Sequence, residues 1–246
     1  LKNKRVFISG GGSGIGATIV EYFCEQNSEV YFIDIDIKAS EKLIKNIKKK
    51  RLRIPNFIEC NILDIKKLQN IIKEIIIKKG PIHCLVNSAA NDDRHTTERV
   101  DEKYWENRMG INLKHYFFAA QSAVKGMKKI KSGSIINLSS VSWMLGEGDK
   151  VVYETAKSAV IGLTRSFAQE FGKYNIRTNS VIPGSIATER QIKHWLTPEY
   201  KKLILESQAL KRQLKPEDVA RLVLFLASDQ SSGCTKQSFV IDAGIA

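Results

Sequence analysis

The sequence lacks any long hydrophobic run. Apolar residues make up 43% of its 246 residues, but no stretch approaches the roughly 20 consecutive apolar residues that a membrane-spanning helix needs. The chain enters a strand-like pattern at Arg5-Val6-Phe7-Ile8, with no apolar core of a secretion signal ahead of it. We therefore expect a soluble cytoplasmic protein without a membrane partner.

Cysteine is scarce, and its arrangement is that of isolated thiols. Cys24, Cys60, Cys84 and Cys234 form no Cys-x-x-Cys pair and do not cluster with the four histidines at the spacing of metal ligands. We expect reduced and mostly buried thiols, and no metal site.

Acidic residues are few relative to basic ones. The chain has 39 Lys and Arg against 26 Asp and Glu, a net charge of +13, which can indicate a nucleic-acid-binding protein. Much of the excess, however, lies in residues 42–53 and 66–79, where Ile and Leu recur at helical spacing. The lysines there are typical of the solvated faces of amphipathic helices. We therefore expect no nucleic-acid partner.

Segments of strand length alternate along the chain with longer segments of helical periodicity. Strand-like apolar bursts lie at residues 5–9, 29–33, 56–60, 83–86, 134–138, 177–182 and 238–241. Helical patterns extend over residues 14–27, 38–51, 64–79, 101–130, 152–173 and 216–228. This alternation predicts an α/β fold with a doubly wound parallel sheet of the Rossmann type, whose strands are joined by right-handed crossovers.

No repeat, low-complexity tract or Pro- and Gly-rich linker divides the chain, so we predict one domain over residues 1–246. Residues 185–214 break the alternation by adding helical material before the last strand. In doubly wound sheets, ligands bind at the carboxyl ends of the strands. We interpret this segment as a substrate-binding or lid segment.

A glycine-rich turn, SGGGSGIG at residues 9–16, follows the first strand pattern. Such a turn lets backbone N–H groups approach a pyrophosphate at a helix N-terminus, although it can also be purely architectural. The second strand pattern ends at Asp34, 18 residues beyond Gly16, where a carboxylate can accept hydrogen bonds from the adenosine ribose. Asp34 would repel a 2′-phosphate, and the turn contains no Arg or Lys. NAD is therefore favoured over NADP.

The segment YETAK places Tyr153 and Lys157 four residues apart in a helical pattern. The two side chains would project from one helix face in consecutive turns, close enough for the ammonium to act on the phenol. The pattern also occurs where a tyrosine at the edge of the core lies below a solvated lysine, so the spacing alone does not separate these interpretations.

Together, these features resemble the classical short-chain dehydrogenase/reductase family over the whole chain. The spacing Ser9-Gly10-x-x-x-Gly14-x-Gly16 is similar to the family's cofactor turn, and NSAA at residues 87–90 is similar to its Asn-Asn-Ala-Gly segment. Asn61 stands where the family often has an aspartate beside the adenine. The resemblance implies that NAD is bound by Gly10, Ser13, Gly14, Ile15, Gly16, Asp34, Ile35, Asn61, Ile62, Asn87, Ser88, Ala89, Tyr153, Lys157, Pro183, Gly184, Ile186 and Thr188.

The resemblance also implies a catalytic tetrad of Asn112, Ser140, Tyr153 and Lys157. Ser140 lies 13 residues before Tyr153, and the adjacent Ser139 is the alternative for its role. Tyr153 would be the base, which requires its pKa to fall by about 2–3 units from the usual value near 10. Lys157 and a positively charged nicotinamide could supply that shift in a site shielded from water. Lys157 would also hold the nicotinamide ribose, Ser140 would orient the reacting hydroxyl, and Asn112 would anchor a proton path through water.

Three further segments resemble bacterial NAD-dependent aldose 1-dehydrogenases, in particular the D-xylose type. They are NDDRH at residues 91–95, SWMLGEGDKVVYETAK from Ser142, and KHWLTPE from Lys193. This resemblance implies hydride transfer from C1 of an aldose, such as D-xylose or D-glucose, to NAD, giving an aldonolactone. A sugar site combines an aromatic platform with carboxylates and amides. The candidate substrate residues are Asn91, Ser142, Trp143, Glu147, Glu154 and Gln191.

Two other functions stay open at this stage. One is a dehydrogenase or reductase for another substrate, such as a 3-oxoacyl thioester, and the other is a catalytically silent dinucleotide-binding protein, because a fold does not fix a function. The resemblance further implies a homotetramer, since the family usually assembles in that way.

Overall fold

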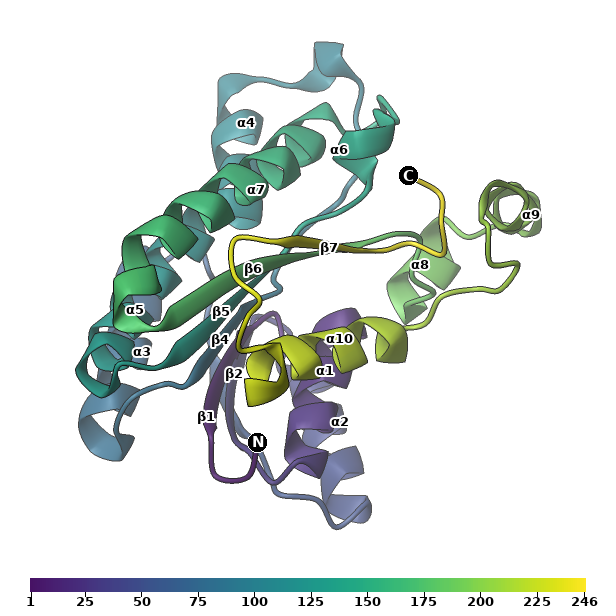
Figure 1. Ribbon diagram of the computed structural model, residues 1–246. Helices are drawn as coiled ribbons and strands as arrows, with labels where there is room; N and C mark the ends of the chain where they lie inside the picture. Colours follow the sequence, from purple (N-terminus) through teal and green to yellow (C-terminus); the bar gives the residue numbers. More distant parts are fainter.

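A computed structural model describes residues 1–246 and contains one seven-stranded parallel sheet (Figure 1). The strand order is β3-β2-β1-β4-β5-β6-β7. The strands are β1 (Arg5–Ser9), β2 (Glu29–Asp34), β3 (Asn56–Glu59), β4 (Cys84–Asn87), β5 (Gly133–Leu138), β6 (Ile176–Pro183) and β7 (Ser238–Ile241). Every neighbouring pair is parallel. The predicted fold class is therefore confirmed, and each predicted strand is present.

Helices cover both faces of the sheet. Helices α1, α2 and α10 lie on one face, and α3, α5 and α7 lie on the other (Figure 1). The helices are α1 (Gly14–Glu25), α2 (Ile37–Lys49), α3 (Ile65–Lys79), α4 (Glu102–Met109), α5 (His115–Ile130), α6 (Ser142–Leu145), α7 (Val151–Phe171), α8 (Glu189–His194), α9 (Pro198–Ser207) and α10 (Pro216–Ala227). None of them combines the length and the apolar character needed to cross a membrane.

The core is split into two layers by the sheet. In β1, Val6 and Ile8 pack on the side of α1 and α10, whereas Phe7 packs on the side of α3 and α5. This alternation follows from the strand period of two, and both layers are apolar because a parallel sheet is covered on both faces. Cys24, Cys60 and Cys84 are buried free thiols within these layers, as predicted.

The sheet order reverses between β1 and β4. From β1 the chain moves outward through β2 to β3, and it then returns to β4 on the other side of β1. The loops that leave the carboxyl ends of these two strands diverge, which opens a crevice between them. The glycine-rich turn follows β1 and NSAA begins at the end of β4, so the fold brings both motifs to this crevice.

The single helix predicted over residues 101–130 is wrong in one respect. A π-helical turn, Gly110–Lys114, separates α4 from α5. Within it, the buried Asn112 side chain accepts a hydrogen bond from Asn91 N at 2.9 Å and donates one to Asn91 O at 3.0 Å. These tertiary bonds to the loop after β4 accompany the wider turn, a feature frequent at functional sites.

Residues 185–214 form α8 and α9 between β6 and α10. Figure 1 shows these two helices beyond the carboxyl end of the sheet, away from the main helical layers. The segment is anchored at both ends, because Ile186 and Leu214 form a parallel β-bridge. The structure thus contains the predicted additional helical material, whose role as a lid stays a prediction.

Candidate active site

The turn after β1 brings two backbone segments unusually close. A Cβ atom on Gly16 would lie 1.8 Å from Gly10 O, and one on Gly10, whose φ is +69°, would lie 2.6 Å from Ala89 Cα. The Ser9 hydroxyl accepts hydrogen bonds from Ser88 N at 3.2 Å and Ala89 N at 3.3 Å. The glycine turn and the segment after β4 therefore form one rigid wall.

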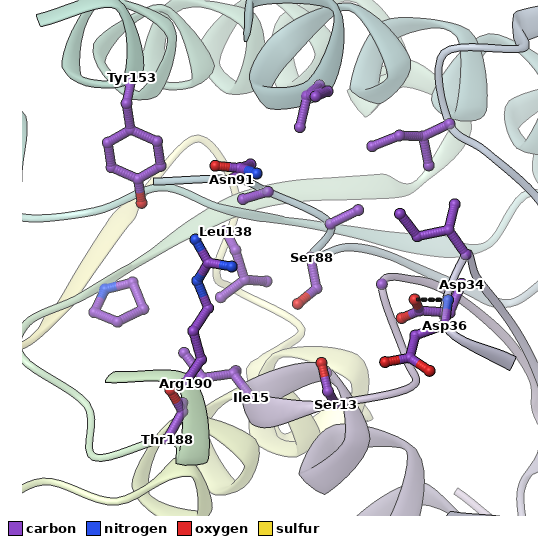
Figure 2. Close-up of a pocket in the computed structure, with 18 of the residues that line it drawn as sticks. Ser13, Ile15, Asp34, Asp36, Ser88, Asn91, Leu138, Tyr153, Thr188 and Arg190 are labelled. Carbon is purple, nitrogen blue, oxygen red and sulfur yellow. Dashed lines mark hydrogen bonds between the residues drawn. The ribbon is translucent and has the colours of Figure 1, made fainter. Parts of the chain in front are cut away.

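A cavity of about 460 Å³ extends along this wall, a size typical of ligand pockets. Figure 2 shows Asp34 and Asp36 at one end, Tyr153 at the other, and Ser13 and Ile15 of the turn between them. The bare glycine backbone, the N-terminus of α1 and the acidic end match the requirements of a dinucleotide. The residues present therefore fit such a cofactor.

The acidic end of the cavity is built from the end of β2. Asp34 accepts hydrogen bonds from Gly12 N at 2.8 Å and from Asp36 N at 3.0 Å, which fixes its carboxylate in the cavity wall. Asp36 adds a second carboxylate that the sequence analysis did not select. The side-chain carbonyl of Asn61, predicted to accept from the adenine, accepts from Leu63 N at 3.0 Å.

Most of the predicted cofactor residues line this cavity. They are Gly10, Ser13, Ile15, Gly16, Asp34, Ile35, Asn61, Ile62, Ser88, Ala89, Tyr153, Lys157, Pro183 and Thr188. Gly184 and Ile186 instead line a neighbouring cavity. Gly14 begins α1 without lining either cavity, and Asn87 is buried, donating to Asn137 Oδ1 at 2.9 Å. Their contact with the cofactor stays a prediction.

Tyr153 lies where the two cavities meet, because it lines both. Burial, and to a smaller extent the carboxylate of Asp92, raise the pKa of Tyr153 above its usual value, whereas Ser140 acts in the opposite direction. The depressed pKa predicted for this phenol is therefore not a property of the protein alone. Added positive charge is needed before Tyr153 can act as a base near neutral pH.

The two adjacent serines have different environments. Ser139 donates to the backbone carbonyl of Lys157 at 2.7 Å and is buried, so it links β5 to α7. Both serines line the second cavity together with Tyr153, but the hydroxyl of Ser140 donates to no backbone carbonyl and lies 3.0 Å from that of Ser142. The geometry favours Ser140 over Ser139 as the serine that meets a substrate.

Lys157 is 1% exposed, and burial lowers its pKa to about 7. Its Nζ donates to Leu138 O at 2.8 Å and to the hydroxyl of Tyr116 at 2.9 Å. The same Nζ lies 5.6 Å from the centroid of the Tyr153 ring. Lys157 therefore shares a helix face and a cavity with Tyr153, as the spacing predicted, but its hydrogen bonds go to other partners.

Asn112 lines neither cavity, although its neighbour Ile111 lines the first. Both ends of its amide are occupied by the backbone of Asn91, as described above. The structure thus places three members of the predicted tetrad at one junction and the fourth behind it. Its role in a proton path stays a prediction.

Comparison with known proteins agrees with this geometry. A family model described as enoyl-(acyl carrier protein) reductase matches residues 10–246. The D-xylose 1-dehydrogenase of Caulobacter vibrioides is 44% identical over 244 residues, covering 99% of this chain and 96% of that protein. The chain belongs to the short-chain dehydrogenase/reductase family.

Other relatives show the same relationship. A protein of Rhizobium meliloti named "Probable galactose dehydrogenase GalD" is 40% identical over 245 residues, covering 100% of this chain and 96% of that protein. The crystal structure of a 3-oxoacyl-[acyl-carrier protein] reductase from Brucella melitensis has a TM-score of 0.92 at 27% identity and covers 99% of this chain and 91% of that chain. As a short-chain dehydrogenase/reductase, the chain is an oxidoreductase with a site for a nicotinamide dinucleotide.

A second cavity, of about 660 Å³, adjoins the first. The residues that line both are Ile15, Ala90, Ser139, Tyr153, Pro183 and Thr188. Three of the predicted substrate residues line it, namely Ser142, Glu147 and Gln191. Asn91 lines the first cavity. Trp143 and Glu154 line neither, and Glu154 accepts a hydrogen bond from Glu147 N at 3.2 Å. The aromatic platform predicted at Trp143 is therefore not in the cavity.

Residues that the sequence analysis missed organise the wall of the second cavity. Asp92 accepts a hydrogen bond from Gln191 Nε2 at 2.6 Å and pairs with Arg190 at 3.4 Å. Arg94 pairs with Asp149 at 3.0 Å, and its guanidinium lies 4.4 Å from the ring centroid of Trp195. These contacts join the loop after β4 to α8 and to the segment before α7. NDDRH was singled out in the sequence, but no spacing rule links it to residues about a hundred positions away.

A group of three carboxylates, Glu147, Asp149 and Glu154, lies at the rim of this cavity with oxygens within 4.8 Å of one another. Lys150 forms ion pairs with both Glu147 and Asp149. A cation of the protein therefore already neutralises much of this acidic group.

Proposed function

We propose that this chain is an NAD-dependent aldose 1-dehydrogenase that oxidises C1 of a cyclic aldose to an aldonolactone. The observation that carries the proposal is the second cavity, which opens onto the phenol of Tyr153 and the hydroxyl of Ser140 and is lined by both apolar and polar side chains. The two relatives named as D-xylose and galactose dehydrogenases support the same substrate class.

In the proposed reaction, Tyr153 accepts the proton of the C1 hydroxyl and Ser140 orients that hydroxyl. Gly10, Ser13, Asp34, Lys157 and Thr188 would be among the residues that hold the dinucleotide, which supplies the hydride acceptor when bound. Lys157 is the positive charge that the protein contributes beside the phenol, and it stabilises the phenolate that proton removal requires. Lys157 is buried, and a charge shielded from water interacts more strongly with its neighbours.

The charges around the second cavity favour a neutral sugar. Arg94 and Lys150 line it, but each is paired with a carboxylate. Asp92 is held by Gln191 and Arg190. The cavity therefore presents hydroxyl, amide and paired ionic groups beside apolar side chains such as Leu145 and Ile204. This mixture suits the hydroxyls and C–H faces of an uncharged sugar better than a carboxylate or phosphate.

The proposal of NAD over NADP is supported by Asp34 and Asp36. Both carboxylates line the end of the cofactor cavity, and Asp34 is fixed there by two backbone hydrogen bonds. A 2′-phosphate at this end would meet two like charges.

A substrate panel tests the proposed function directly. Purified protein with NAD should form NADH with D-xylose, D-glucose or a related aldose, and a lactone should be the product. The matched arm uses a 3-oxoacyl thioester with NADH, because the family model and the Brucella melitensis structure carry acyl-reductase descriptions. Turnover of the thioester alone would replace the sugar proposal with the acyl one.

The homotetramer implied by the resemblance and the cytoplasmic location expected from the sequence stay predictions. Sedimentation of the purified protein would test the first, and fractionation of cells that express the chain would test the second.

A further inference from the structure

Lys157 forms a hydrogen bond with Tyr116, which lies on a different helix from Tyr153. Tyr116, on α5, is 0% exposed, and its hydroxyl accepts a hydrogen bond from Lys157 Nζ at 2.9 Å. That hydroxyl donates to Leu138 O at 2.9 Å, and Lys157 Nζ donates to the same carbonyl at 2.8 Å. The ammonium, the phenol and the carbonyl thus form a closed triangle at the end of β5.

The π-helical turn explains why Tyr116 reaches this position. An α-helix advances about 100° per residue, so the residue that a π turn adds rotates the following helix face by about that amount. After the turn at Gly110–Lys114, both His115 and Tyr116 are fully buried. Their rings meet edge to face, with the ring centroids 4.4 Å apart. The irregular turn therefore aims a phenol at Lys157.

The hydrogen bonds of this triangle stabilise the charged form of a buried lysine. A buried ammonium needs hydrogen-bond acceptors to replace water, and without them it loses its proton. Lys157 has three N–H groups in its charged form, of which the phenol oxygen and the carbonyl of Leu138 accept two. One N–H is left for a ligand in the cofactor cavity.

We propose that Tyr116 is a positioning residue whose hydroxyl fixes the ammonium of Lys157 in the cofactor cavity and keeps it protonated. The inference rests on the proposed function, because it assumes that Lys157 supports Tyr153 as the base. Tyr116 lines neither cavity, so it acts only through Lys157.

Other groups around Lys157 act with or against Tyr116. Burial and the charge of Lys157 lower the pKa of His115 to about 3, so this ring is neutral and adds no repulsion. Asp92 favours the charged lysine from the loop after β4. Tyr153 faces Lys157 from its own helix, and Arg190 lines the same cavity. Tyr116 is the side chain among these that accepts a hydrogen bond from the ammonium directly.

Tyr116→Phe isolates the hydroxyl, because the ring, whose centroid lies 5.1 Å from Lys157 Nζ, stays in place. Losing an acceptor on an ammonium should lower the lysine pKa by about one unit. Less positive charge then remains beside Tyr153, so the pH at which kcat for aldose oxidation is half-maximal should rise by roughly half a unit to one unit. Tyr31→Phe, which removes another buried phenol hydroxyl far from the site, is the matched control and should leave the profile unchanged.

A binding readout keeps this inference separate from the proposed sugar oxidation. The affinity for NADH, followed by fluorescence across pH, should weaken as Lys157 loses its proton, and in Tyr116→Phe this loss should occur about one unit lower. The affinity for NADH can be measured even if the protein oxidises no aldose, in which case only the proposed sugar oxidation fails. Tyr116→Met, which also removes the hydroxyl and has a flexible side chain that adapts to the core, gives the same measurement if the Phe variant does not fold. Profiles and affinities that superimpose on those of the unaltered protein would show that Tyr116 only fills space.

Discussion

Asp34 illustrates how a single side chain sets a chemical preference. Its carboxylate does two tasks in the structure, since it accepts the Gly12 N–H and also places a negative charge at the end of the cofactor cavity. The first task needs only an oxygen, whereas the second needs the charge. A substitution that separates them can therefore test the choice of cofactor.

Asp34→Asn keeps the acceptor for Gly12 N–H, gives up the one for Asp36 N–H and removes the charge. We expect the ratio of kcat/KM for NAD to that for NADP to fall by about tenfold or more, because a like charge no longer opposes the 2′-phosphate. Steady-state rates with both dinucleotides measure this ratio. An unchanged ratio would move the cofactor preference to Asp36 or to the backbone.

At the scale of single residues, the sequence predicts the positions of side chains that are fixed by their near neighbours along the chain. Tyr153 and Lys157 share a helix face, and Asp34 ends a strand, so neighbours in sequence suffice to place them. Tyr116 and Arg190 reach the site through contacts between distant segments. Nothing in their immediate neighbours distinguishes Tyr116 from an ordinary buried tyrosine of a helix.

Helices and strands show the same difference between features that local sequence determines and features that depend on contacts between distant segments. The strands and the glycine turn carry strong local signals, and the structure contains all of them. The π turn at Gly110–Lys114 could not be predicted, because its residues fit an uninterrupted helix and its distinguishing contact is the pair of bonds from Asn112 to Asn91. The substrate-binding loops are the hardest part to predict from the sequence. Trp143 is an aromatic residue of the kind that can stack on a sugar, but it lines neither cavity.

Gly16→Ala tests the strand-turn-helix element. A methyl group would lie 1.8 Å from Gly10 O, so the turn must shift. We expect affinity for NADH to fall at least about tenfold, since the backbone N–H groups lose their arrangement around the phosphates. Fluorescence titration measures it. Gly162→Ala, on α7 with nothing within 4 Å of the added carbon, is the control and should bind normally. Normal binding by the Gly16 variant would place the cofactor elsewhere.

At the scale of the whole molecule, the site reduces the stability of the fold. Lys157 is buried, and its pKa falls from 10.5 to about 7 on folding. The unfolded chain therefore holds this proton more tightly, so the cost is full below about pH 7 and disappears as the pH rises toward 10.5. The proposed function thus uses a charge that the fold would be more stable without.

Lys157→Met should stabilise the protein and abolish turnover. We expect a gain of about 2 kcal/mol at pH 7, less than burial of the charge alone would give because two hydrogen bonds are lost. The melting temperature should rise by about 5 °C, and this gain should shrink when melting is repeated toward pH 10. A variant that melts at a lower temperature than the unaltered protein at pH 7 would show that burial of the Lys157 charge does not destabilise the fold.

The central claim is that the phenol of Tyr153 is the base of the reaction, and one comparison tests it most directly. NADH formation from NAD and an aldose substrate is followed for the unaltered protein and for Tyr153→Phe, with NADH binding measured in parallel. We predict that the variant loses nearly all turnover, by a factor of about a hundred or more, while it binds NADH as before. Normal turnover in Tyr153→Phe would contradict the account.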